Sequence, residues 1–286
     1  DSSKNAGFAC FGSPSEILDD LKTNSPEEVA QLVELRVRGL EILKKTCGEK
    51  EIEFEQLGSH EVFTRSEDAL FERCASKLEE LNKLLAPVFK DDIFEMADQR
   101  ISEFGFENVN HLIKNKLEGQ INTGKMINQF IKIARAHDID IINGAEVSSL
   151  SDEKTSVNLV INNEFTFSAK KVLIANNGFA AQLLPELDVE PARAQVLVTS
   201  PINDLSLKGT FHMLEGFYYF RNVGNRVLFG GGRNLDKAGE TTTSLSLSEL
   251  IQNDLEKKLK EIILPQKDFT IEHLSLIHIS EPTRQK

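Results

Sequence analysis

The chain has 286 residues, long enough for one large domain or two of ordinary size with a substantial buried core. Its net charge of −12, from 33 basic and 45 acidic residues, argues against nucleic acid or an anionic membrane surface as the partner. The three cysteines stand far apart, so the sequence indicates neither a zinc site nor a disulfide framework. The scattered cysteines fit a reducing, cytoplasmic setting, with peripheral membrane association as the alternative. No apolar run approaches roughly 18 residues, so we expect no transmembrane segment.

Two long helices are predicted in the first third of the chain. Residues 25–28 (Ser-Pro-Glu-Glu) form a capping-box pattern, and apolar residues then recur at helical spacing up to Gly48. Residues 53–64 are predicted to be extended. Residues 67–85 are predicted to be a charged amphipathic helix that ends before Pro87.

The pattern becomes regular after Glu118. Thr123 is predicted to cap a helix that runs through His137. The predicted strands that follow cover residues 139–143, 146–150, 156–162, 165–168 and 171–176. This order is typical of a parallel nucleotide-binding sheet that carries an antiparallel meander.

Longer antiparallel strands are predicted after Pro191. Residues 216–223 and 226–231 form a hairpin across Gly224-Asn225, a strong two-residue turn signal. The turn fixes the register, so Tyr219 faces Gly230 and Arg221 faces Leu228, and Tyr219 and Arg221 project from one face. A final amphipathic helix is predicted over residues 246–263.

Four short motifs stand in the chain at wide intervals. They are residues 3–9 (Ser-Lys-Asn-Ala-Gly-Phe-Ala), 118–125 (Glu-Gly-Gln-Ile-Asn-Thr-Gly-Lys), 175–178 (Ala-Asn-Asn-Gly) and 216–233. In this order they resemble the D-amino-acid oxidase family of FAD-dependent oxidoreductases, which includes glycine and sarcosine oxidases. The resemblance implies an α/β fold: a truncated Rossmann-like FAD-binding domain joined to an α+β substrate domain with an antiparallel sheet.

The resemblance also implies that both ends of the chain are unusual. In the family, the turn matching residues 3–9 follows a βαβ unit with Gly-x-Gly-x-x-Gly, a pattern that this chain does not contain. Residues 274–284 look like the translation of a sequencing-library adapter, so residues 274–286 are expected to be a non-native tail. We therefore expect a fragment of a longer flavoenzyme that binds FAD weakly or not at all.

Domain boundaries follow from the same resemblance. Residues 1–52 and 110–190 are assigned to the incomplete FAD-binding domain. Residues 53–109 and 191–265 are assigned to the substrate or cap domain.

Non-covalent FAD is implied as the cofactor, because no attachment pattern for a covalent flavin is visible. In the family, the N-terminal turn holds the diphosphate or the ring edge, and the residues matching Val147 and Gly178 lie near the nucleotide. The residues assigned to FAD on this basis are Ser3, Asn5, Ala6, Gly7, Val147, Ala175, Asn176, Asn177, Gly178 and Gly231. By residue type alone, Val147 could equally be a buried strand valine and Gly178 a plain turn glycine.

A substrate carboxylate needs a cation, and the planar fork of an arginine suits it. Arg221 with Tyr219 is the candidate clamp, with Tyr218 and Arg233 behind it. The alternative is structural: Tyr219 covers the cross-strand Gly230, and Arg221 is a solvated charge on an edge strand.

The function expected of the parent protein is oxidation of the CH–NH bond of a small amino acid or secondary amine, by hydride transfer to flavin. The electron acceptor is oxygen or a quinone. Two alternatives stay open. The parent is an FAD-dependent 2-hydroxy-acid dehydrogenase, or the chain as given is a truncated fragment without activity.

Overall fold

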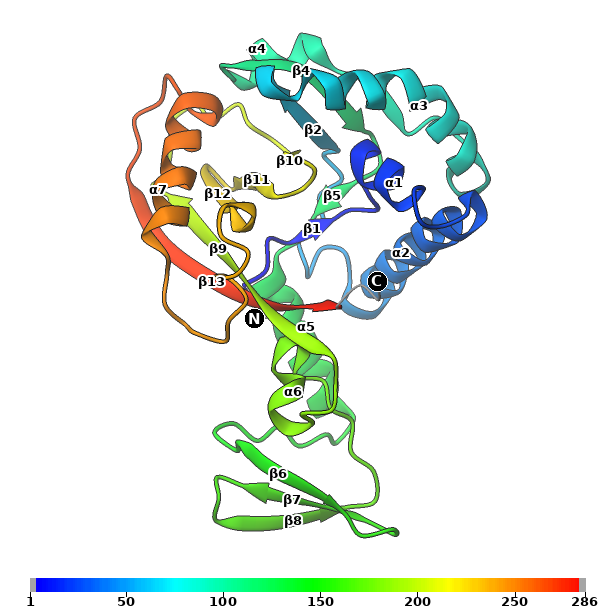
Figure 1. Cartoon of the computed structure of the whole chain (residues 1–286), viewed down its shortest axis with the longest axis vertical. Coiled ribbons are helices and arrows are strands. Elements are labelled where there is room, and N and C mark those ends of the chain that lie inside the picture. Colours follow the sequence, from blue (N-terminus) through cyan, green and yellow to red (C-terminus); the bar gives the residue numbers. More distant parts are fainter. Residues whose placement is uncertain (1–3, 283–286) are drawn as a thin grey trace.

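The computed structural model describes residues 4–282, which fold into a large body and a smaller projecting part (Figure 1). The helices are α1 Pro14–Asp20, α2 Pro26–Cys47, α3 Asp68–Phe89, α4 Ile101–Phe104, α5 Thr123–Ala136, α6 Ala180–Leu183 and α7 Glu249–Lys258. The strands of the large body are β1 Phe8–Ala9, β2 Ser59–Thr64, β3 Phe94–Met96, β4 Val109–Asn115, β5 Gly119–Gln120, β9 Val189–Thr199, β10 Thr210–Met213, β11 Tyr218–Val223, β12 Arg226–Gly231 and β13 Ile271–Pro282. The projecting part contains β6 Val147–Asp152, β7 Val157–Ile161 and β8 Phe165–Ala169.

An eight-stranded mixed sheet forms the centre of the large body, in the order β13-β9-β12-β11-β10-β2-β4-β3. Its strand pairs are antiparallel except for β10 with β2. The hairpin β11–β12 has the predicted register, with Tyr219 opposite Gly230 and Arg221 opposite Leu228, so this prediction is confirmed. The α/β fold class predicted from the sequence is confirmed as well.

The two faces of the sheet bury different cores, because successive side chains of a strand point to opposite sides. Tyr218 and Phe220 of β11 enter an aromatic core with Phe211 and Phe229, which also includes Leu255 of α7. A second core lies beneath α1, α2 and α3. Tyr219 and Arg221 therefore face the side over which the N-terminal segment runs.

The predicted ends of α2 are confirmed, whereas the predicted end of α3 and the predicted cap of α5 are not. Helix α2 begins with a capping box between Ser25 and Glu28 and ends at Gly48. Helix α3 continues to Phe89, so the predicted stop before Pro87 was wrong, because Pro87 removes only one amide donor from the last turn. Helix α5 is capped by Asn122 rather than by Thr123, since the Asn122 side chain accepts from the Lys125 amide at 3.0 Å.

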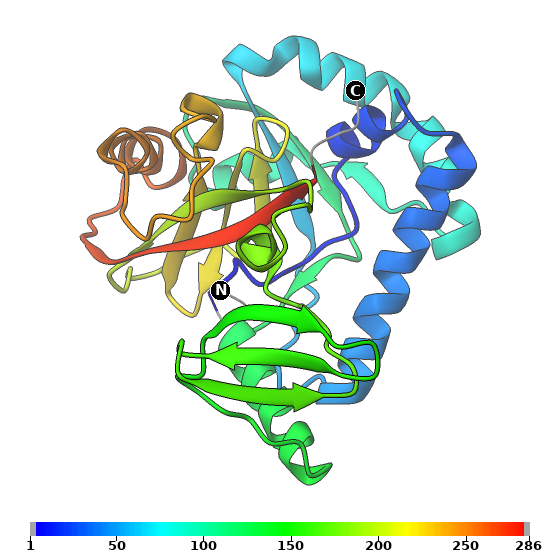
Figure 2. The ribbon, with the colours of Figure 1, turned by 60° about the horizontal axis from the view of Figure 1, so that its bottom comes forward.

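Two predicted strands, residues 139–143 and 171–176, are not strands in the structure. Their apolar side chains stay in solvent: Ile142 is 74% exposed and Leu173 is 89% exposed. A strand needs a neighbouring backbone for its ladder of hydrogen bonds, and no described segment pairs with these residues. The predicted meander is present as the antiparallel sheet β6-β7-β8, which comes forward in Figure 2.

The last described strand lies at the edge of the large sheet. β13 pairs antiparallel with β9 from Thr199 to Val189, so residues 274–282 of the predicted non-native tail belong to this strand, and residues 283–286 lie outside the described residues. β4, most of which falls in the range assigned to FAD binding, pairs with β2 in the same sheet. The domain boundaries stay a prediction.

No helix among the described residues is long and apolar enough to cross a lipid bilayer.

A buried ion pair connects β9 to the loop before α7. Arg193 donates from Nε and Nη2 to the two carboxylate oxygens of Glu240, at 2.8 and 2.7 Å. Both side chains are buried, with 7% and 2% exposed, and Gln195 donates to the same carboxylate. Removing one partner of such a pair leaves an uncompensated buried charge.

Arg193→Met is therefore expected to lower the free energy of unfolding by about 3–5 kcal/mol. The measurement is urea denaturation followed by circular dichroism. Lys83→Ala is the matched control, because Lys83 forms an exposed pair with Glu79, and solvent screens such pairs so that they contribute little to stability. Equal effects of the two substitutions would contradict the assigned role of the buried pair.

Candidate functional site

The N-terminal segment forms a short turn that lies against the large sheet. Asn5 Oδ1 accepts from the Gly7 amide at 2.9 Å, and the Ile121 amide donates to Gly7 O at 2.8 Å. After the turn, β1 pairs antiparallel with β5, which places Phe8 opposite Gln120. The segment is thus bound to the motif at residues 118–125.

Arg221 fixes this turn from the face of β11. Its guanidinium is buried and donates from Nε to Ala6 O at 2.5 Å and from Nη2 to Ile121 O at 3.1 Å. Gly7 has φ +72°, and a Cβ there would lie 2.5 Å from Ile121 O and 2.9 Å from Arg221 Nη2. Only glycine fits this position without strain. Burial lowers the pKa of Arg221 to about 10, which leaves it charged at neutral pH.

Tyr219 packs tightly over the neighbouring strand. A Cβ at Gly230 would lie 2.8 Å from three atoms of the Tyr219 ring and hydroxyl, so Tyr219 covers this cross-strand glycine. Phe8 meets the ring edge-on at a centroid distance of 5.9 Å. Burial raises the pKa of Tyr219 to about 12, so the phenol is neutral at physiological pH.

The other two residues of the predicted clamp lie elsewhere. Tyr218 points into the opposite core, where its hydroxyl donates to Asp254 Oδ2 of α7 at 2.7 Å. Arg233 lies in the turn after β12 and contacts the Thr241 hydroxyl at 3.4 Å. The position of Tyr218 follows from strand alternation, because Tyr218 and Tyr219 are neighbours and must point to opposite faces.

The residues predicted to hold FAD fall into separate groups. Asn5, Ala6 and Gly7 lie at Arg221, as described above, whereas Ser3 lies outside the described residues. Val147, Ala175 and Asn176 line a cavity of about 640 Å³ beside the three-stranded sheet.

The remaining FAD candidates are packed against backbone. Asn177 Nδ2 donates to His278 O at 3.1 Å, and a Cβ at Gly178 would lie 2.9 Å from Ile279 O. Gly231 has φ +127°, and a Cβ there would lie 2.1 Å from Phe217 O. These two glycines allow close approach of protein backbone.

The cavity at Val147 is suited to part of a nucleotide. Its walls are polar and apolar in equal measure, and its volume falls within the range of about 300–1,000 Å³ that is typical of ligand sites. Asn176 Oδ1 is buried and has no hydrogen-bond partner among the described residues. A buried acceptor without a donor is costly, and a ligand donor would satisfy it.

A second cavity, of about 400 Å³, opens beside Arg221. Its lining residues are Glu53, Glu55, Gln120, Ile121, Asn122, Arg221, Asn222, Val223 and Gly224. Gln120 Nε2 donates to Glu55 Oε2 at 2.7 Å, while Gln120 Oε1 is buried without a partner among the described residues. Glu55 and Gln120 were not among the predicted site residues, although Gln120 belongs to the motif at residues 118–125.

Glu118 anchors the segment that follows β1. Its carboxylate is buried and accepts the Phe11 amide and, at 3.1 Å, the Gly12 amide, together with the Ser59 hydroxyl. Burial raises the pKa of Glu118. One carboxylate thereby joins the N-terminal segment, β2 and the loop before β5.

Comparison with known families decides the family of this chain. A family described as FAD dependent oxidoreductase (DAO) matches residues 1–277. The chain belongs to this family. The resemblance seen in the sequence is thereby confirmed, and FAD is the cofactor of this family of oxidoreductases.

Several solved structures share the fold of this chain. Glycine oxidase from Geobacillus kaustophilus is 16% identical with a TM-score of 0.72, over 99% of this chain and 73% of that chain. Iminodiacetate oxidase from Chelativorans sp. BNC1 is 13% identical with a TM-score of 0.70, over 100% and 74%. L-Proline dehydrogenase from P. horikoshii is 18% identical with a TM-score of 0.67, over 86% of this chain and 66% of that chain. A search of curated protein sequences found no match.

A second buried carboxylate predicts a pH dependence of stability. Glu61 of β2 accepts the Ser15 hydroxyl and, at 3.1 Å, the Ser15 amide at the start of α1. Burial raises the pKa of Glu61 from 4.5 to about 7. Because the folded state holds this proton more tightly than the unfolded chain, the stabilisation is complete below pH 4.5 and is lost as the pH rises through about 7.

Glu61→Gln should remove this dependence, since the amide does not titrate. Between about pH 4.5 and pH 8, the free energy of unfolding of the unsubstituted protein should fall relative to that of Glu61→Gln by on the order of 3 kcal/mol. Urea denaturation of both proteins across this range gives the difference. Parallel pH profiles would show that Glu61 ionises normally in the folded protein.

Proposed function

We propose that this protein oxidises the CH–NH bond of a small amino acid or secondary amine by hydride transfer to non-covalently bound FAD. The imine product is then hydrolysed by water to a carbonyl compound and an amine or ammonia. The family assignment supports amino-acid or amine oxidation in general. The choice of substrate rests on the cavity beside Arg221.

For the cofactor, we propose that Val147, Ala175 and Asn176 hold the adenosine part. The orphan Asn176 Oδ1 is the acceptor for a ligand N–H or O–H. Asn5, Ala6 and Gly7 approach the flavin part of the cofactor. Bound FAD supplies the hydride acceptor, so the protein's own task is to orient the substrate and to keep its nitrogen in a reactive state.

The observation that carries the proposal is the pairing of opposite charges in one cavity. Arg221 offers the cation, and its Nη1 group is not used by the two hydrogen bonds to Ala6 and Ile121. Glu55 and the free Gln120 Oε1 offer acceptors on the same cavity. A zwitterionic amino acid has a carboxylate for the first group and an ammonium for the second. The ammonium gives up one proton to solvent before the hydride leaves the carbon, because only the neutral amine has the lone pair that forms the C=N bond of the imine.

This arrangement favours an amine over a 2-hydroxy acid. A hydroxy acid would satisfy Arg221 in the same way, but it brings one neutral donor in place of a cationic nitrogen. Glu55 would then gain a hydrogen bond from a neutral hydroxyl but no ion pair. The 2-hydroxy acid is the second candidate and serves as the reference substrate in the test.

Glu55→Gln tests the proposal, because it keeps the contact with Gln120 and removes only the charge. With FAD-loaded protein, the concentration of sarcosine or glycine that gives half the maximal rate of anaerobic flavin bleaching should rise about threefold to tenfold, while the corresponding concentration of lactate should change less. Glu34→Gln, at an exposed position on α2, is the control and should behave as the unsubstituted protein does.

Reduction of the flavin by lactate and not by any amine would establish the second candidate. A protein that takes up no FAD would contradict the proposal for this polypeptide and would support the alternative that it is an inactive fragment. Reoxidation of the reduced flavin by oxygen or by a quinone identifies the electron acceptor.

A further inference from the structure

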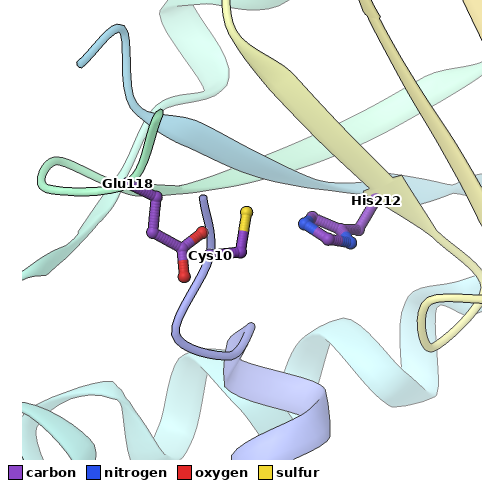
Figure 3. Close-up of side chains that lie close together, drawn as sticks. All are labelled: Cys10, Glu118 and His212. Atoms are coloured by element: carbon purple, nitrogen blue, oxygen red, sulfur yellow. The ribbon is translucent and has the colours of Figure 1, made fainter. Parts of the chain in front are cut away.

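Three potential metal ligands from distant parts of the chain meet beside β1. Cys10, Glu118 and His212 each offer one ligand atom, and these atoms lie within 4.8 Å of one another. Figure 3 shows the Cys10 sulfur between the Glu118 carboxylate and the His212 ring. Cys10 follows β1, Glu118 precedes β5 and His212 lies on β10, so the cluster is formed only by the tertiary fold.

The hydrogen bonds around Glu118 leave room for one more partner. Oε1 accepts from the Phe11 and Gly12 amides, and Oε2 accepts from the Ser59 hydroxyl. A carboxylate has about four acceptor positions, so one position on Oε2 is left for another partner. The Cys10 side chain interacts with the Glu118 carboxylate.

His212 gives an independent indication of a missing ligand. The residue is only 9% exposed, and its Nε2 has no hydrogen-bond partner among the described residues. Its ring points toward the Cys10 sulfur (Figure 3), and Phe8 packs edge-on against it at a centroid distance of 5.1 Å. An imidazole nitrogen buried in this way is costly unless a donor or a metal ion meets it.

We propose that Cys10, Glu118 and His212 bind a zinc ion. A thiolate, an imidazole and a carboxylate are the ligands that Zn²⁺ takes in proteins, and three protein ligands leave the fourth tetrahedral position to water. Zinc bonds of about 2.0–2.3 Å place ligand atoms about 3.5 Å apart, so side-chain adjustments of about an ångström close the site.

The charges of the three ligands suit a divalent cation at this buried site. Zn²⁺ bound to one thiolate and one carboxylate carries no net charge, which avoids the cost of a buried ion. The thiol proton is released to solvent when the sulfur binds the metal, as is any proton on the Glu118 carboxyl. Without an ion, burial and the nearby Glu118 carboxylate raise the pKa of Cys10, so a free thiol here is a poor nucleophile.

The site would bind the N-terminal segment to β10. Cys10 already lies 3.8 Å from the Thr210 hydroxyl of that strand. A metal ion would add bonds between the segment, the motif at residues 118–125 and the large sheet. This inference stands apart from the proposed flavin chemistry, because its test measures metal binding.

The first measurement uses the full chain equilibrated with ZnCl₂ and desalted, with metal content determined by mass spectrometry. One equivalent of zinc is expected, with binding that weakens as the pH falls. Replacement by Co²⁺ should give a thiolate-to-cobalt charge-transfer band in the near ultraviolet. Protein without bound zinc, or with a cobalt spectrum that lacks this band, would overturn the proposal.

The second measurement compares variants. Cys10→Ala and His212→Gln should each lower the zinc affinity by at least about 10–100-fold, the loss caused by removing even outer partners of a metal ligand. Cys47→Ala and Cys74→Ala are the matched controls, because both cysteines are buried away from the cluster. Circular dichroism checks that each variant is folded. Folded Cys10→Ala that binds zinc as the unsubstituted protein does would also overturn the proposal.

Discussion

The buried carboxylate of Glu118 is the contact on which the arrangement of the site depends. A carboxylate without exposure is costly unless donors surround it, and here two amides of the N-terminal segment and one hydroxyl of β2 do so. The segment is therefore fixed to the sheet at Phe11 and Gly12. Arg221 fixes the same segment at Ala6, which precedes β1 in the sequence.

Between these two anchors, the segment covers the face of β11 that carries Tyr219 and Arg221. The opposite face carries Tyr218 and Phe220 into the aromatic core beneath α7. Because successive side chains of β11 point to opposite faces, this one strand supplies side chains both to the core and to the candidate site. Local signals predicted this much from the sequence: the Gly224-Asn225 turn set the register, and the capping box at Ser25 set the start of α2.

Contacts between distant parts of the chain could not be predicted in this way. No local spacing connects Cys10 with Glu118 and His212, so the sequence indicated no metal site, and Glu55 carries no motif of its own. Residues 171–176 have the composition of a buried strand, but a strand also needs a partner, which composition cannot report. The family was recognised from short motifs in a fixed order, and one of these motifs is the turn at residues 3–9. The motifs did not show that Arg221 donates a hydrogen bond to this turn.

Amide hydrogen exchange tests most directly whether the N-terminal segment is anchored to the sheet. The amides of Phe11 and Gly12 should exchange as slowly as that of Phe220 in the core, because each is released only when the buried contact with Glu118 opens. Leu173, which is 89% exposed, gives the rate of an unprotected amide in the same protein. Exchange of Phe11 and Gly12 at the rate of Leu173 would contradict the account.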